Sequence, residues 1–233
     1  MFTHVQGVLS SSGASSVTSL TATLGSTPVA RNLLICGVIL GGTNTTKQIC
    51  KDSNNNFYVN TRLTPYLASG GFAGIYYLIA PSNATTSVTL SWTSSISGAI
   101  WVDEFGTGGA NVILDTEATA TGGPAVTMNT PSITPGTPTE LLYAIGSSGS
   151  SNVTAPTANG TLGIWTGTGG GPDSATGTGG GTEYLLSSSS GSSAVQFTQA
   201  ASSSWASMVA AFKISFSAIV EEYGQVTAFG RSV

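Results

Sequence analysis

Hydrophobic and β-branched residues occur in short runs along almost the whole chain, and clusters of Gly, Ser, Asn and Pro separate these runs at near-regular intervals. Examples are NLLICGVIL (32–40), GIYYLIA (74–80) and WASMVAAFKISF (205–216), all rich in residues that favour strands. No run before the tail carries the 3.6-residue apolar stripe of a helix. Roughly fourteen short strands joined by turns predict an all-β fold, a two-sheet antiparallel β-sandwich that is jelly-roll-like.

The chain of 233 residues divides into a sandwich over residues 1–213 and a C-terminal arm over residues 214–233. An all-β domain of this length can remain undivided. The arm holds the acidic pair Glu221–Glu222 among apolar residues that a solvated tail would not need. We therefore expect the arm to pack on its own domain or to dock on a neighbouring subunit. The residues expected to make this contact are Ile219, Val220, Tyr223, Val226 and Phe229.

Charged residues are scarce, at 7% of the chain, and six basic against ten acidic residues give a net charge of −4. Without a basic cluster we expect no nucleic-acid partner and no anionic membrane partner. The longest apolar run, Leu33 to Leu40, is too short to span a bilayer. The first residues lack the basic and long apolar regions of a secretion signal. We expect synthesis in the cytoplasm, where the protein stays or which it leaves by lysis or as part of an assembled particle.

The hexapeptide TGTGGG occurs twice, at 166–171 and 176–181. A dinucleotide-binding loop needs G-x-G-x-x-G between a strand and a helix. Counted from Gly167 the sixth residue is Pro172, and counted from Gly177 it is Thr182, so neither copy completes the motif. The repeat is interpreted as a loop between two strands, and no cofactor is expected.

Candidate catalytic groups are few and dispersed. His4 is the only histidine, has no acidic neighbour in sequence, and is expected at a surface or an edge. Asp103 and Glu104 are adjacent, and neighbouring side chains on a strand point to opposite faces. They therefore cannot flank one glycosidic bond together. We expect no catalytic residues and no enzymatic activity.

Two stretches have some character of a calcium site. Asp115 and Glu117 could share a strand face and bind Ca²⁺, although solvated surface acids are the favoured interpretation. DSNNNF (52–57) begins like a calcium loop, but Phe57 stands where that loop needs glycine. A hairpin turn with asparagine in a left-handed conformation explains it better. No metal site is expected.

Cys36 and Cys50 are the only cysteines. If their strands form a hairpin centred near Thr43, the two would lie opposite each other and could form a disulfide. Two buried free thiols in a cytosolic protein are the favoured interpretation.

Four tryptophans and seven tyrosines could supply a surface for stacking on sugars. Trp92, Trp101 and Trp205 lie in strand-like runs, where core packing is the default. Trp165 and Tyr184 flank the glycine repeat and are the best candidates for glycan stacking. A carbohydrate-binding or adhesin module therefore remains an alternative function, with surface glycans as the partner.

Five stretches resemble a β-sandwich domain of phage virion structural proteins and bacterial surface proteins. They are RNLLICGVILGG, ICKDSNNNFY, GIYYLIAPSNATTSVTLSW, SGAIWVDEFGTGG and the final TEYLLSSSSGSSAVQFTQAASSSWASMVAAFK. The resemblance covers residues 3–213 and carries no active site. It implies a structural virion component, most of all a capsid decoration or cement protein, with a tail or fibre component as the next possibility. The expected partners are copies of itself and other virion proteins.

Overall fold

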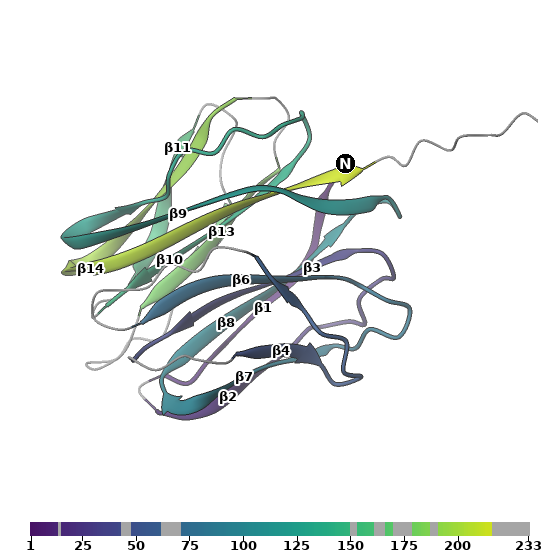
Figure 1. Cartoon of the computed structure of the whole chain (residues 1–233), viewed down its shortest axis with the longest axis horizontal. Coiled ribbons are helices and arrows are strands. Elements are labelled where there is room, and N and C mark those ends of the chain that lie inside the picture. Colours follow the sequence, from purple (N-terminus) through teal and green to yellow (C-terminus); the bar gives the residue numbers. More distant parts are fainter. Residues whose placement is uncertain are drawn as a thin grey trace, which may run out of the picture.

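The computed structural model describes residues 1–13, 15–42, 48–61, 71–149, 153–160, 166–169, 179–186 and 191–215. This part of the chain holds fourteen β-strands and no helix, and all strand pairs are antiparallel. The predicted all-β antiparallel sandwich is confirmed. Its strands form three sheets, stacked in layers, where the sequence suggested two (Figure 1).

The middle sheet has five strands, in the order β1 (Thr3–Ser11), β8 (Gly98–Gly106), β3 (Leu33–Leu40), β6 (Phe72–Ile79) and β5 (Val59–Asn60). The lower sheet has three strands, in the order β2 (Val17–Thr23), β7 (Ser87–Ile96) and β4 (Ile49–Asp52).

The upper sheet has six strands. Five of them follow the order β11 (Val153–Gly160), β14 (Ser193–Ser215), β10 (Leu141–Ser148), β13 (Gly180–Leu186) and β12 (Thr166–Gly169). The sixth, β9 (Asn111–Asn129), pairs with β14.

Each face of the middle sheet covers a hydrophobic core, which is why a third layer is needed. Strand β3 is buried at every residue, as expected for a continuous apolar run that is covered on both faces. Leu34, Cys36 and Val38 of β3 point into the lower core, with Leu90 and Trp92 of β7 among its other members. The alternate β3 residues point into the upper core. Large side chains of that core are Leu33, Ile35, Ile39, Trp101, Phe105, Tyr143 and Phe212.

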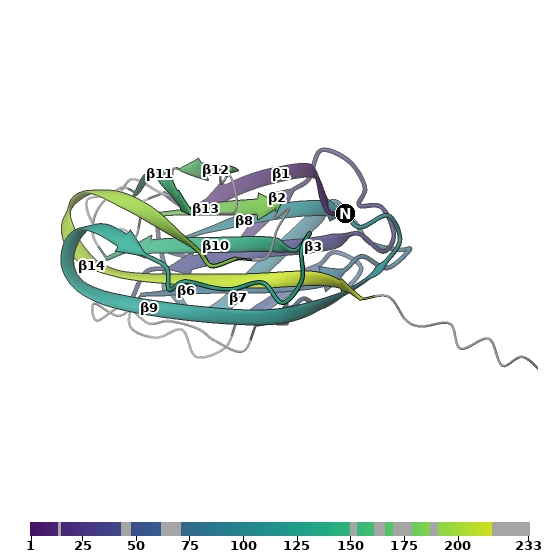
Figure 2. The same cartoon turned by 90° about the horizontal axis from the view of Figure 1, so that it is seen from above.

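Strands β9 and β14 are long, at 19 and 23 residues, and Figure 2 shows them curving together at one end of the molecule. The bend carries Gly122–Gly123–Pro124 of β9, and the pairing register with β14 shifts around Ser203. Proline is tolerated here because β9 is at the edge of its sheet. A third, smaller core lies behind the bend, where Phe197 fits against Gly146 of β10.

Two local expectations change. AVQFTQA and WASMVAAFKISF read as two strands, yet β14 runs from Ser193 to Ser215 without a break, since the serines between them bend the strand rather than end it. The glycine repeat was expected to be only a loop, but its outer parts pair as β12 and β13, with Gly169 opposite Gly181. Backbone pairing needs no side chain, so glycine is admitted there.

The strands that hold the two cysteines do not form the hairpin under which a disulfide was considered. Strand β3, which holds Cys36, pairs with β6 and β8 in the middle sheet. Strand β4, which holds Cys50, pairs with β7 in the lower sheet. The two cysteines meet across the lower core instead, and both are buried, which confirms the expectation of two buried free thiols.

Candidate functional site

The most reactive-looking group of side chains lies between the middle and upper sheets, at edge strand β1. His4 Nε2 is 2.9 Å from Asp103 Oδ1, and the Tyr143 hydroxyl is 2.8 Å from Asp103 Oδ2. His4 lies on an edge strand, as expected, but its acidic partner comes from 99 residues away. The pairing of β1 with β8, which shifts register between His4 and Gln6, brings the two together.

Aromatic rings complete this His4–Asp103–Tyr143 cluster. The ring of Tyr184 on β13 stacks on His4, with centroids 4.8 Å apart and planes at 18°. The Phe105 ring meets both edge-on, at 5.3 Å from His4 and 5.1 Å from Tyr184. Tyr184, a candidate for glycan stacking, is therefore engaged within the protein on one ring face.

Two glycines make room for the cluster. A Cβ on Gly7 would collide with the Asp103 carboxylate, and a Cβ on Gly37 would lie 2.9 Å from Thr182 Cγ2 and 3.1 Å from the Tyr143 hydroxyl. Both distances are shorter than ordinary carbon contacts. Gly7 leaves room for the Asp103 carboxylate within the middle sheet, and Gly37 lets the upper sheet approach the middle sheet closely at Thr182 and Tyr143.

The cluster holds its own side chains in fixed orientations and connects the middle sheet to the upper sheet. Burial above all, and then the Asp103 carboxylate, raise the pKa of Tyr143, while a hydrogen bond with Thr182 acts in the opposite direction. Tyr143 therefore stays protonated and donates to Asp103. Both oxygens of Asp103 act as hydrogen-bond acceptors. The nitrogen of His4 that faces Asp103, Nε2, therefore carries a proton. The contacts of the imidazole are one carboxylate and two aromatic rings, a set that fixes a histidine in place.

Glu104 points to the opposite face of β8 from Asp103, as the strand alternation predicted. Its carboxylate is fully buried and accepts from Gln6 Nε2 at 2.6 Å, Asn32 Nδ2 at 2.6 Å and the Val29 backbone N–H at 2.8 Å. The Asn32 side-chain oxygen in turn accepts from the Thr107 N–H. Glu104 thus fastens the segment before β3 to the middle sheet.

Asp52 organises the DSNNNF turn. Its Oδ1 accepts from the N–H groups of Asn54 and Asn56, both at 2.9 Å, and its Oδ2 from the Thr85 N–H at 3.1 Å. Asn55 has φ of 63°, which confirms the predicted left-handed asparagine. The carboxylate is turned toward backbone donors, and this explains the sequence better than a calcium loop does.

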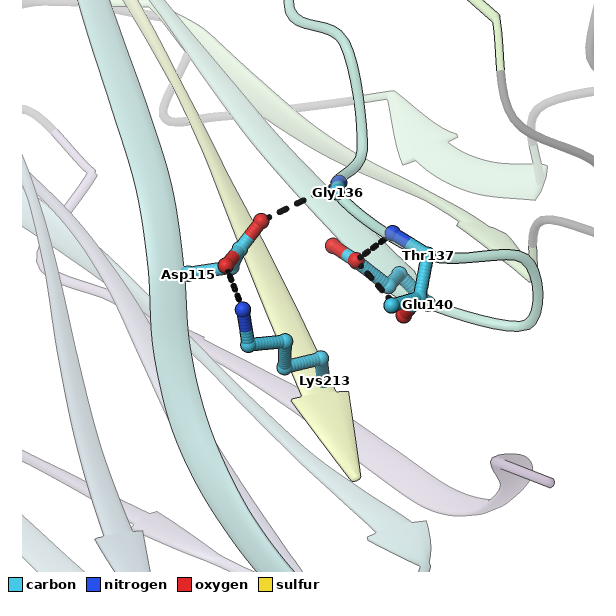
Figure 3. A network of polar contacts seen from close by, with 5 residues as sticks. All are labelled: Asp115, Gly136, Thr137, Glu140 and Lys213. Atoms are coloured by element: carbon cyan, nitrogen blue, oxygen red, sulfur yellow. Dashed lines mark hydrogen bonds and ion pairs between the residues drawn. The ribbon is translucent and has the colours of Figure 1, made fainter. Parts of the chain in front are cut away.

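A second polar network lies near the end of β14 (Figure 3). Lys213 forms an ion pair with Asp115 of β9, and Asp115 Oδ2 also accepts from the Gly136 N–H at 3.1 Å. Glu140 accepts from the N–H and hydroxyl of Thr137 at 2.7 and 2.9 Å. The hydrogen bond with Asp115 raises the pKa of Lys213. The favoured expectation that Asp115 is a solvated surface acid is wrong, because Lys213 of the neighbouring strand binds it.

Two further titratable groups are buried. Desolvation, followed by a hydrogen bond with Cys36, raises the pKa of the Cys50 thiol. Burial also raises the pKa of Glu183 to about 7, and its Oε2 has no hydrogen-bond partner among the described residues. Glu183 pairs with Ala144 of β10, which belongs to the third core. It therefore lies on the face of the upper sheet that is turned away from Asp103.

The remaining predicted residues fall outside the described part of the chain. These are Trp165 of the glycan-stacking pair and the arm residues Ile219, Val220, Tyr223, Val226 and Phe229. Sequence reasoning missed Tyr143, Gln6 and Asn32. The alternation of TELLYAIGS places Tyr143 on the same face as Leu141 and Ile145, but nothing in the sequence names Asp103 as its partner.

Comparison with protein-family models, with curated proteins and with solved structures found no match for this chain. Within the described ranges, no group of three or more His, Cys, Asp or Glu side chains is placed to hold a metal ion. The same ranges contain no helix with the length and apolar character of a membrane span.

Proposed function

We propose that this protein is a structural component of a phage particle, with capsid decoration or cement as the favoured role and a tail or fibre position as the next. It acts by binding rather than by catalysis, and it assembles with copies of itself and with other virion proteins. The virion assignment rests on the resemblance of residues 3–213 to virion β-sandwich domains.

The main support for a structural role is that the acidic side chains bind other groups of the protein. Asp52 holds a turn, Glu104 fastens a loop to the middle sheet, Asp103 connects two sheets and Asp115 connects β9 to β14. Each carboxylate accepts from groups that the fold itself supplies. An enzyme that uses acid or base chemistry would instead aim such groups at a substrate.

The layered architecture suits a particle component in a second way. Three stacked sheets give two large cores and one smaller core, so the domain buries much of its surface without disulfide bonds. Charged residues are only 7% of the chain, so few ionised groups lie at the surface.

The arm is the part proposed to make the assembly contact. Residues 216–233 follow Ser215, the last residue that the structure describes, and contain Ile219, Val220, Tyr223, Val226 and Phe229. Burial of such side chains on a neighbour stabilises a contact by roughly 1.5–3 kcal/mol for each large residue.

Immunogold microscopy of particles purified from the source of this sequence tests the proposal. Regular labelling of the capsid supports a decoration role, and labelling confined to the tail supports the next possibility. Particles that lack the protein would refute the virion assignment. A glycan array with purified protein is the parallel test for an adhesin.

A further inference from the structure

The outer face of the connection between β4 and β5 gathers exposed apolar side chains around a lysine. Ile49 of β4, Phe57 of the connecting segment and Val59 of β5 are 36%, 58% and 57% exposed, and the two strands belong to different sheets. Lys51 lies among them, opposite Phe57 in an antiparallel bridge.

The register explains why these side chains point outward together. The Tyr58 N–H donates to the Cys50 carbonyl at 2.9 Å, so Cys50 and Tyr58 are neighbours, and both are buried in the lower core. Side chains on either side of them along each strand must therefore point the other way, toward solvent. We name this outward set the β4–β5 patch: Ile49, Lys51, Phe57 and Val59.

The β4–β5 patch carries positive charge. The Lys51 Nζ lies 5.9 Å from the centre of the Phe57 ring and donates to Asn55 Oδ1 at 2.7 Å, so the ammonium is held at the patch. Lys47 and Arg62 flank this segment in the sequence, and three of the six basic residues therefore fall within residues 47–62. The acidic residue within residues 47–62 is Asp52, which is 2% exposed and accepts hydrogen bonds from backbone N–H groups.

The C-terminal arm has the complementary composition. Glu221 and Glu222 stand between Ile219–Val220 and Tyr223, so the arm combines apolar side chains with negative charge as the patch combines them with positive charge. The 18 residues after Ser215 can reach about 60 Å when extended, far enough to cross to another subunit.

We propose that the arm of one copy docks on the β4–β5 patch of a second copy. Its apolar residues cover Ile49, Phe57 and Val59, and Glu221 and Glu222 lie near Lys51. The inference rests on the proposed assembly role of the arm and adds the surface that receives it. Because the two contacting surfaces differ, the contact forms either a reciprocal pair or a longer assembly.

Charge reversal in the full chain tests the pairing. Lys51→Glu in one variant, and Glu221→Lys with Glu222→Lys in another, should each weaken self-association about fivefold or more in sedimentation experiments. An equimolar mixture of the two variants should recover association, because a reversed arm then meets a reversed patch on another copy. If association recovers only when all three substitutions are in one chain, and does not recover in the mixture, the arm docks on its own copy and the proposal is wrong.

Removal of the apolar contact is the second test. Phe57→Ser with Val59→Thr should weaken association about tenfold or more. The matched control is Val5→Ser with Leu9→Ser on β1, whose side chains are 47% and 41% exposed, and it should leave association unchanged. Circular dichroism would verify that each variant is folded.

The outcomes separate this inference from the function on which it rests. If changes in the arm weaken association and changes in the β4–β5 patch do not, the docking surface is wrong while the assembly role of the arm stands. If neither set of changes has an effect, both are wrong.

Discussion

Replacement of Glu104 by alanine removes the carboxylate that joins β8 to β1 and to the segment before β3. The variant loses three hydrogen bonds, to Gln6, Asn32 and the Val29 N–H. Asn32 is 6% exposed, so its amide keeps little access to water, whereas Gln6 is less buried and can be rehydrated. A buried donor left without a partner costs about 1–3 kcal/mol, and the space left by the side chain adds to this cost.

The expected loss for Glu104→Ala is therefore about 4 kcal/mol, a large part of the 5–15 kcal/mol typical of a folded domain. Urea titration followed by tryptophan fluorescence should show a midpoint lower by about 1.3–2 M, for a denaturant slope of about 2–3 kcal/mol/M. Glu104→Gln should lower the free energy of unfolding by about half as much as Glu104→Ala, because the amide nitrogen of the glutamine would face hydrogen-bond donors. Thr21→Ala, at an exposed pair with Thr89, serves as the control. A change of less than 0.5 kcal/mol for the alanine variant, on the order of an ordinary surface substitution, would refute this account of Glu104.

Three further predictions follow from the buried groups. Burial raises the pKa of Glu183 to about 7 from 4.5, so its contribution to stability should be complete below pH 4.5 and be lost as the pH rises through 7. The loss is at most about 3 kcal/mol, less where water reaches the carboxylate, and Glu183→Gln should abolish it in unfolding experiments at several pH values. Gly37→Ala should lower stability by about 1–3 kcal/mol, since its Cβ would lie 2.9 Å from Thr182; an unchanged melting temperature would contradict the close packing. Cys36 and Cys50 are both buried and should react with a thiol reagent only after denaturation, so fast labelling of the folded protein would place them at the surface instead.

The strands were largely predictable because their signal is local. Runs such as Leu33–Leu40 and Leu141–Ser148 are read directly from β-branched and apolar composition, and the two carboxylates Asp103 and Glu104 follow from alternation along one strand. The turn at Asn55 was predictable for the same reason, since asparagine tolerates a left-handed conformation.

The number of sheets and the polar clusters were not predictable, because they depend on which strands pair. His4 meets Asp103 across 99 residues, and the meeting depends on a register shift in β1. The continuous burial of β3 requires a layer on each side, yet a run of apolar residues does not say which strands supply those layers. The ion pair between Lys213 and Asp115 was missed for the same reason, since it depends on the pairing of β9 with β14.

Light scattering coupled to size-exclusion chromatography, applied to the full chain and to a chain truncated after Ser215, tests the central claim most directly. Every strand of the described part of the chain ends at or before Ser215, so we expect the truncated protein to remain folded, unfold cooperatively and elute as a monomer, while the full chain forms a larger assembly. Assembly that is unchanged without the arm would contradict the account, and unfolding upon truncation would place the arm in the core of its own domain.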